Sequence, residues 1–322
     1  MIVLVSVVAA VAAVATVAGA LLQGGDAGGE VHGQTATQAD RAEPPALELA
    51  VVDRDDAEAR ALRAAEDAYE EGDAGLASQR FAEVLADNPE SIEAAVGAAV
   101  VDDPGETVER LEELVDANPE SAVARLNLGL ALLATGESDA ATTQWHEAER
   151  REPDSPAALR AEDLRNPDSP PGRPVFILNG FPRDLEDVPA ARRLSELRRR
   201  AESGGAREWL VLGSGLETVG HRVSAQRAYD RALALDPGLL EASVAAAVSR
   251  FDKDDPSRAF SRLGPLAPKH PKSALVRFHL GLLLLWLPNV EEARRQLGLA
   301  RAEGGSYGRQ AARILQTLDE TQ

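Results

Sequence analysis

The chain has 322 residues and a formal net charge of −19, with 53 Asp and Glu residues against 34 Lys and Arg residues. This acidic balance disfavours nucleic acid as a partner of the whole chain. The absence of Cys excludes a disulfide framework, thiolate zinc sites and cysteine catalysis. Hydrophobic residues make up 44% of the chain and aromatic residues only 4%, a composition that suits a stack of Ala- and Leu-rich helices.

Residues 1–22 predict a membrane segment, because residues 2–22 are uncharged and apolar. At about 1.5 Å per helical residue this run is long enough to cross a hydrocarbon layer of about 30 Å. We interpret it as a retained transmembrane anchor, because it exceeds the usual apolar core of a signal peptide. The expected protein is therefore single-pass, with its repeats outside the cytoplasm. The alternative is secretion after cleavage near Ala20, since Ala18-Gly19-Ala20 is similar to a small-residue cleavage site.

Residues 23–57 are rich in Gly, Ala, Asp and Glu and lack sustained helical periodicity. This composition predicts a flexible, acidic linker. A short apolar stretch within it, residues 47–52, is a candidate for docking on the first helices.

A 34-residue spacing organises the rest of the chain. Gly213, Ala247 and Gly281 are 34 residues apart, and so are Pro237 and Pro271. A period of this length is typical of a stacked helical repeat. The sequence predicts seven helix pairs, with the boundaries 58–91, 92–121, 122–155, 156–205, 206–239, 240–273 and 274–307. Residues 308–322 predict a capping helix and tail.

The residues at fixed offsets have physical roles in a helix pair. Gly129 and Ala141 are small, so that two helix backbones can approach each other. Gly136 and Gly220 follow the first helix, where a left-handed residue ends it. Pro153 follows the second helix and removes a hydrogen-bond donor.

The fourth unit carries an inserted loop, residues 166–186, whose prolines and glycines exclude a helix. It contains the apolar run 175–178. We expect this run to fold back over the helices of the unit; the alternative is an exposed strand that binds a partner.

These offsets resemble the tetratricopeptide repeat (TPR) family. The resemblance implies an all-α fold, a right-handed superhelical solenoid of about seven helix pairs with a capping helix, in which partners bind along the first helix of each pair. The family's groove positions fall on ten residues: Asn127, Leu130, Arg207, Ser214, Glu217, Val248, Phe251, Phe278, Leu282 and Trp286.

Charge is distributed unevenly between the repeats. Residues 61–155 contain 23 acidic and 6 basic residues, whereas residues 156–322 contain 21 acidic and 25 basic residues. A possible basic patch comprises Arg192, Arg193, Arg199 and Arg200. Solvated helix faces explain this pattern, and a partner surface is the alternative.

We identify no motif for catalysis, a cofactor or a metal: the five His residues do not have metal-ligand spacing, and Gly213-Ser214-Gly215 lacks the GxSxG frame of a nucleophile elbow. We therefore expect a membrane-tethered, non-enzymatic scaffold that binds a protein or peptide partner, in one version during assembly of an envelope complex. The alternative is a homo-oligomeric structural protein in which acidic and basic halves stack.

Overall fold

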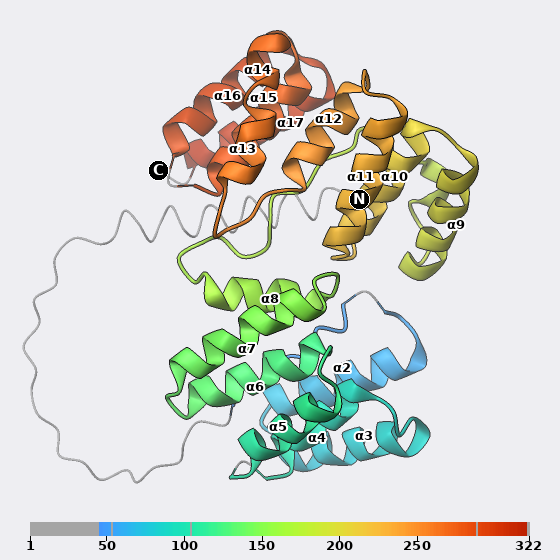
Figure 1. Cartoon of the computed structure of the whole chain (residues 1–322), viewed down its shortest axis with the longest axis vertical. Helices are drawn as coiled ribbons and strands as arrows, with labels where there is room; N and C mark the ends of the chain where they lie inside the picture. The colour runs from blue at the N-terminus through green and yellow to red at the C-terminus, as the bar shows by residue number, and fades with distance from the viewer. Residues whose placement is uncertain (1–44, 53, 104, 288, 321–322) are drawn as a thin grey trace, which may run out of the picture.

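The computed structural model describes residues 45–52, 54–103, 105–287 and 289–320. Within these ranges every regular element is a helix, and Figure 1 shows the helices in two groups. The first group, the N-terminal block, contains α2 (Ala57–Glu70), α3 (Ala74–Asp87), α4 (Ile92–Val101), α5 (Thr107–Ala117), α6 (Ala122–Ala134), α7 (Ser138–Arg151) and α8 (Pro156–Arg165). The second group, the C-terminal block, contains η1 (Arg183–Leu185), α9 (Ala190–Ser203), α10 (Ala206–Glu217), α11 (Arg222–Leu235), α12 (Leu240–Val248), α13 (Ser257–Leu263), α14 (Leu266–Lys269), α15 (Ala274–Leu285), α16 (Val290–Glu303) and α17 (Gly305–Glu320).

The predicted anchor and the first part of the predicted linker lie outside the described residues. Among the helices that are described, none combines the length and the apolar character needed to cross a membrane.

Side-chain caps set where several first helices begin. The hydroxyls of Ser91, Ser121 and Ser155 each accept a hydrogen bond from the backbone N–H three residues later, at the start of α4, α6 and α8. Ser273 does the same for α15. Such a cap satisfies one of the helix's free N–H donors and typically contributes about 1 kcal/mol.

The predicted left-handed glycines are confirmed. Gly136 and Gly220 have φ angles of +87° and +81°, and Gly72 has +84° in the first pair. A residue with a Cβ is disfavoured here, so glycine allows the chain to reverse between the two helices of a pair.

Gly136→Ala is therefore expected to destabilise the N-terminal block by about 1–2 kcal/mol, the cost of a left-handed alanine. A Cβ on Gly136 meets no atom within 4 Å, so conformational strain is the only penalty. The matched control is Gly298→Ala within α16, which is equally unobstructed and should stabilise by about 0.5–1 kcal/mol. Urea unfolding would measure both, and equal effects would contradict the conformational explanation.

The small residues inside the pairs permit close helix contact. A Cβ on Gly129 would lie 2.2 Å from Trp145 Nε1, and a Cβ on Gly213 would lie 2.4 Å from Tyr229 Cε1. The rings therefore occupy the space that any other side chain would need.

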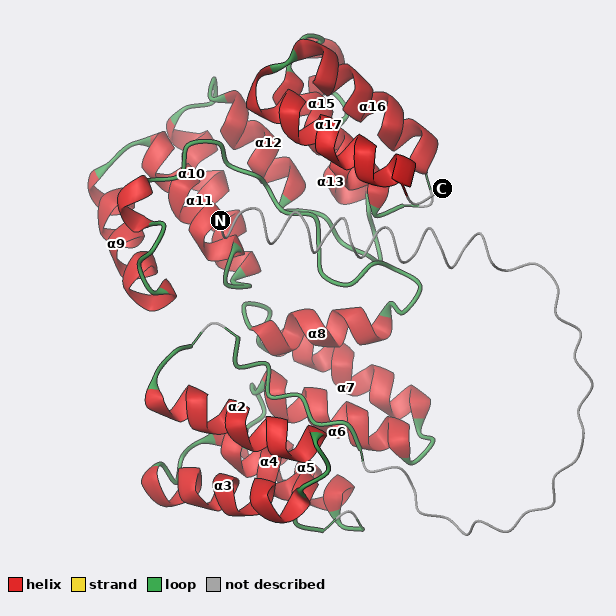
Figure 2. Cartoon of the chain, turned by 180° about the vertical axis from the view of Figure 1, so that it is seen from behind, coloured by secondary structure: helices red, strands yellow, loops and turns green. Residues whose placement is uncertain are grey.

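The helices form layers within each block. The first helices α2, α4, α6 and α8 contact one another in sequence, and α10, α12, α15 and α17 do so in the C-terminal block. Except for α8 and the capping helix α17, each also packs against the second helix of its own pair, as Figure 2 shows from behind. The first helices thus present one continuous face in each block.

The fourth unit, 156–205, does not form the predicted helix pair. Its first helix, α8, packs on α6 and α7, whereas its second helix, α9, packs on α10. The intervening chain from Asn166 to Pro189 contains only the short helix η1 and passes from one block to the other. The buried apolar residues accordingly form two separate clusters, one within residues 47–161 and one within residues 176–318. The continuous seven-pair solenoid is corrected to two blocks.

Candidate peptide grooves

The N-terminal block binds an extended segment of its own chain, residues 45–52. The N–H of Glu48 donates to Oδ1 of Asn127 at 2.9 Å, and Nδ2 of Asn127 donates back to the Glu48 carbonyl at 2.8 Å. One amide side chain thus satisfies both main-chain groups of one residue of the segment.

Further contacts come from helices on either side of α6. Oε1 of Glu66 in α2 accepts the N–H of Leu49 at 2.7 Å, and the Tyr69 hydroxyl donates to the Pro45 carbonyl at 2.8 Å. Arg160 in α8 donates through Nε and Nη2 to the Glu48 carboxylate at 2.5–2.8 Å. The segment therefore lies across the first-helix face from α2 to α8. We call this surface the N-terminal groove.

Alternate side chains of the segment point into the block. Leu47, Leu49 and Val51 are buried, whereas Val52 is 78% exposed. Burial at every second position is the pattern of an extended chain with one face against a surface.

The prediction of a flexible linker through residue 57 is therefore wrong for residues 45–52. The apolar stretch docks on several first helices, beyond the first pair.

A cavity of about 540 Å³ adjoins this segment. Leu49, Ala50 and Val51 form one wall. The other walls include residues at the beginnings of α4, α6 and α8, namely Ile92, Val123 and Pro156. The N-terminal groove thus continues beyond the residues that fill it.

The C-terminal block also binds an extended segment, residues 175–181, which we call the C-terminal segment. The N–H of Phe176 donates to Oε2 of Glu217 at 3.1 Å, and the N–H of Ile177 donates to Nε2 of His279 at 3.0 Å. The Tyr307 hydroxyl donates to the Ile177 carbonyl at 3.0 Å. Glu217, His279 and Tyr307 belong to α10, α15 and α17, so this segment also crosses a first-helix face.

Asn179 fixes the far end of the C-terminal segment. Its carbonyl accepts from Nη2 of Arg207 at 3.0 Å, and its side-chain oxygen accepts from Ser306 and Gln310 at 3.0 and 3.2 Å.

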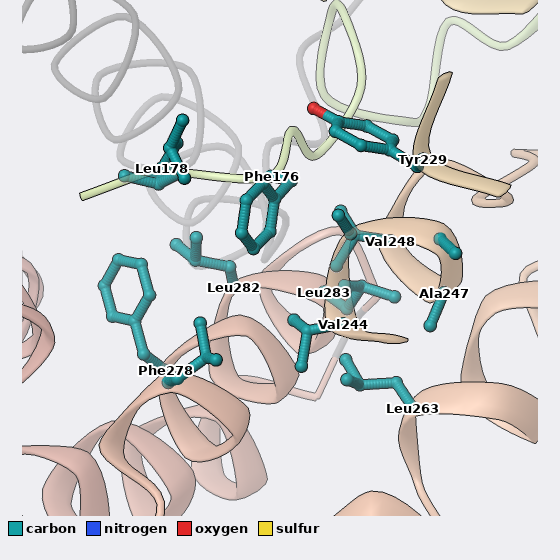
Figure 3. Packing of buried hydrophobic residues seen from close by; sticks show 14 of the residues in the cluster. Phe176, Leu178, Tyr229, Val244, Ala247, Val248, Leu263, Phe278, Leu282 and Leu283 are labelled. Atoms are coloured by element: carbon teal, nitrogen blue, oxygen red, sulfur yellow. The ribbon is translucent and has the colours of Figure 1, made fainter. Parts of the chain in front are cut away.

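Figure 3 shows Phe176 pointing from the segment toward residues of α12 and α15. The Phe176 ring stacks on His279 with 4.9 Å between centroids. The apolar run is buried, so the alternative of an exposed strand is wrong. It covers the C-terminal block and not the fourth unit.

The two blocks use the same repeat positions to bind main chain. Asn127 is the sixth residue of unit 122–155, and His279 is the sixth residue of unit 274–307. Both accept a main-chain N–H from the bound segment. Tyr69 and Glu217 are likewise both the twelfth residue of their units and contact segment main chain. Glu66, Tyr69, Arg160 and His279 were not predicted as contacts, although this register could have indicated His279 once Asn127 was chosen.

Burial changes the protonation of the two acceptors in the C-terminal block. His279 is fully buried, and desolvation lowers its pKa to about 4. The imidazole is therefore neutral at pH 7. Its Nε2 accepts the Ile177 N–H, and its Nδ1 donates to the Leu275 carbonyl. Burial raises the pKa of Glu217 to about 8, against the opposing hydrogen bonds from Tyr229 and Phe176. Both bonds are accepted by Oε2, which leaves Oε1 to carry the proton.

Stability is expected to depend on pH through Glu217. The folded chain keeps this proton up to pH about 8, whereas an unfolded chain releases it near pH 4.5. The contribution of the protonated carboxyl to the free energy of unfolding is therefore complete below pH 4.5 and is lost as the pH rises to 8. Glu217→Gln retains an acceptor and does not titrate. The wild-type protein should therefore lose stability relative to the variant between pH 4.5 and 8. Urea unfolding across this range measures the difference, and a constant difference would contradict the assignment.

The ten predicted groove residues are all wholly or partly buried. Asn127 and Leu130 lie in α6, and Asn127 forms hydrogen bonds to the segment. Arg207 and Glu217 bind the C-terminal segment. Ser214 is buried in α10, and the other five are buried within the C-terminal cluster: Val248, Phe251, Phe278, Leu282 and Trp286.

The four arginines of the predicted basic patch differ in their surroundings. Arg199 and Arg200 both pair with Glu196, at 2.6 and 2.7 Å, and Arg200 also pairs with Asp184. Arg193 is buried and Arg192 is exposed. Neighbouring carboxylates thus neutralise part of the patch.

Charged residues connect the two blocks, in what we call the junction cluster. Glu162 in α8 is only 2% exposed and pairs with Arg173 and, at 3.9 Å, with Arg222 of α11. The neighbouring Asp163 accepts from Nζ of Lys253 at 2.6 Å. Burial and the positive charge of Arg173 lower the pKa of Arg222, and the Glu162 carboxylate opposes that effect. Two acidic residues of α8, in the N-terminal block, therefore pair with basic residues of the linking chain and of the C-terminal block.

In the part of the chain that the structure describes, no three His, Asp or Glu side chains come together as a metal site. No protein-family model matches the sequence, and no curated protein matches it.

Solved structures similar to this chain are helical-repeat proteins. A tetratricopeptide repeat protein from Parabacteroides merdae has 12% identity, covering 81% of this chain and 98% of that one, with a TM-score of 0.35. The C-terminal part of a TPR repeat-containing protein from Cytophaga hutchinsonii has 13% identity over 79% and 99%, with a TM-score of 0.28. Yeast Tom70 has 12% identity over 87% and 66%, with a TM-score of 0.32. The helix pairs of this chain are defined by the contacts between its own helices.

Proposed function

We propose that the protein is a non-catalytic scaffold that holds an extended peptide of a partner protein against the first helices of its repeats. The observation that supports this is the pair of bound segments: each block holds an extended chain through side chains that bond main-chain groups. Such bonds recognise an extended conformation, and neighbouring pockets select side chains. A groove that is already folded before the peptide binds loses little conformational entropy on binding.

Site-specific photocrosslinking tests this proposal. A photoreactive amino acid at Glu120, an exposed residue lining the N-terminal cavity, should crosslink the partner in cells. The matched control is Leu235 at the end of α11, which is 44% exposed and lies outside that cavity. Partner adducts at Glu120 and none at Leu235 are expected; equal adducts at both positions would contradict groove binding.

The proposal includes tethering through residues 2–22, which would raise the local concentration of the scaffold at a membrane, for example during assembly of an envelope complex. Carbonate extraction of the chain with and without these residues tests the anchor. A reporter fused after residue 58 distinguishes the two sides of the membrane, and release of the intact chain by carbonate would contradict tethering.

The charge distribution favours a second candidate, a structural protein whose acidic and basic halves stack between copies. Sedimentation at low and high salt distinguishes the two functions. Oligomers that dissociate with salt would support stacking, and a monomer at both would support the scaffold. We favour the scaffold, because each block holds an extended segment through hydrogen bonds to its main chain.

A further inference from the structure

The N-terminal groove contains the elements of a peptide site with a defined preference. Its occupant presents Leu47, Leu49 and Val51 to the block and binds by its main chain to Asn127. Between the first two apolar residues, the Glu48 carboxylate receives both Nε and Nη2 of Arg160. A two-point contact of this kind is specific for a carboxylate.

The occupant fits this groove imperfectly. Ala50 has a φ of +54° and is the one non-glycine residue with positive φ among those described. After the bend the chain continues to α2, and Nη1 of Arg63 in α2 donates to the Val51 carbonyl at 2.7 Å. Beyond the bend lies the cavity of about 540 Å³, within the size range of ligand pockets. A separate peptide would not need to enter α2, so it could continue straight into this cavity.

Resting on the proposed function, we propose that the N-terminal groove binds a partner's extended peptide with apolar residues at alternate positions and a carboxylate between the first two, and that residues 45–52 compete for this groove from within the chain. Because the internal segment is covalently attached, it acts at a high effective concentration. The apparent affinity for a partner is reduced by the fraction of chains whose groove is closed.

Changes at Ala50 test the competition without altering the groove. The probe is a fluorescent peptide with the sequence of residues 45–52, titrated by anisotropy into the full chain in detergent. Ala50→Gly relieves the bend and should weaken peptide binding about ten-fold relative to wild type. Ala50→Val makes the bend less favourable and should tighten binding. Equal affinity for all three chains, or no binding to Ala50→Val, would overturn the proposal.

Two controls examine the preference itself. A peptide with Lys in place of Glu48 should bind the Ala50→Val chain at least about ten-fold more weakly, because Arg160 then faces a like charge. Asn127→Ala combined with Ala50→Val should also lose binding. Circular dichroism verifies that each variant is folded. Exchange of segments between two copies, seen as a dimer in sedimentation, would overturn the assignment to a partner. The crosslinking experiment above does not depend on any of these results.

Discussion

Phe176→Ala is expected to destabilise the C-terminal block by about 3–5 kcal/mol, the usual cost of removing a buried phenyl ring. Phe176 is 2% exposed, stacks on His279 and packs edge-on against Tyr229 with 5.8 Å between centroids. Its loss leaves a cavity between α11, α12 and α15 and weakens the contact that orients the Ile177 N–H toward His279. Urea unfolding followed by the fluorescence of Trp209 and Trp286 measures the change.

Phe181→Ala is the matched control for this prediction. It removes the same ring from the same segment, but Phe181 is only partly buried against the cluster. A smaller loss of stability is expected, because the Phe181 ring buries less apolar surface on folding than the Phe176 ring does. Equal effects of the two variants would contradict the packing of Phe176 as a core residue.

Glu162→Ala is expected to destabilise the connection between the two blocks by about 3–5 kcal/mol, because it leaves buried positive charge without its partner. Glu162 pairs with Arg173 and Arg222, and all three side chains lie between the blocks. The unfolding transition reported by Trp145, in the N-terminal block, should separate from that of Trp209 and Trp286.

The control for the junction is Glu147→Ala. Glu147 pairs with Arg150 and Arg151 on the surface of α7, where such pairs typically contribute less than about 1 kcal/mol. The double variant Glu162→Ala with Arg173→Ala should recover part of the loss, since the unpaired guanidinium is removed. Similar effects of Glu162→Ala and Glu147→Ala would contradict a structural role for the junction cluster.

The sequence predicted the repeats because their requirements are local. Gly136 and Gly220 must take positive φ at a fixed distance from the helix start, and Gly129 must leave room for Trp145 in the same pair. Each condition involves residues within one 34-residue repeat, so the spacing makes them visible.

The bound segments were not predictable in the same way. Glu48 and Asn127 are 79 residues apart, and Glu48 and Arg160 are 112 apart, so no periodic pattern connects them. The separation of the two helices of the fourth unit could not be predicted for the same reason. Phe176 and Ile177 of its apolar run bond to Glu217 and His279, which are 41 and 102 residues later in the sequence and belong to other units. The family resemblance predicted the first-helix face as the site but did not indicate which segments cover it.

Hydrogen exchange of four amides tests the central claim, that each block holds an extended segment of the same chain. The N–H groups of Glu48, Leu49, Phe176 and Ile177 lie outside helices but bond to side chains of the first helices. We expect all four to exchange far more slowly than in an unstructured peptide, with Phe176 and Ile177 slower than Glu48 and Leu49. Exchange of all four at the rate of an unstructured peptide would contradict the account.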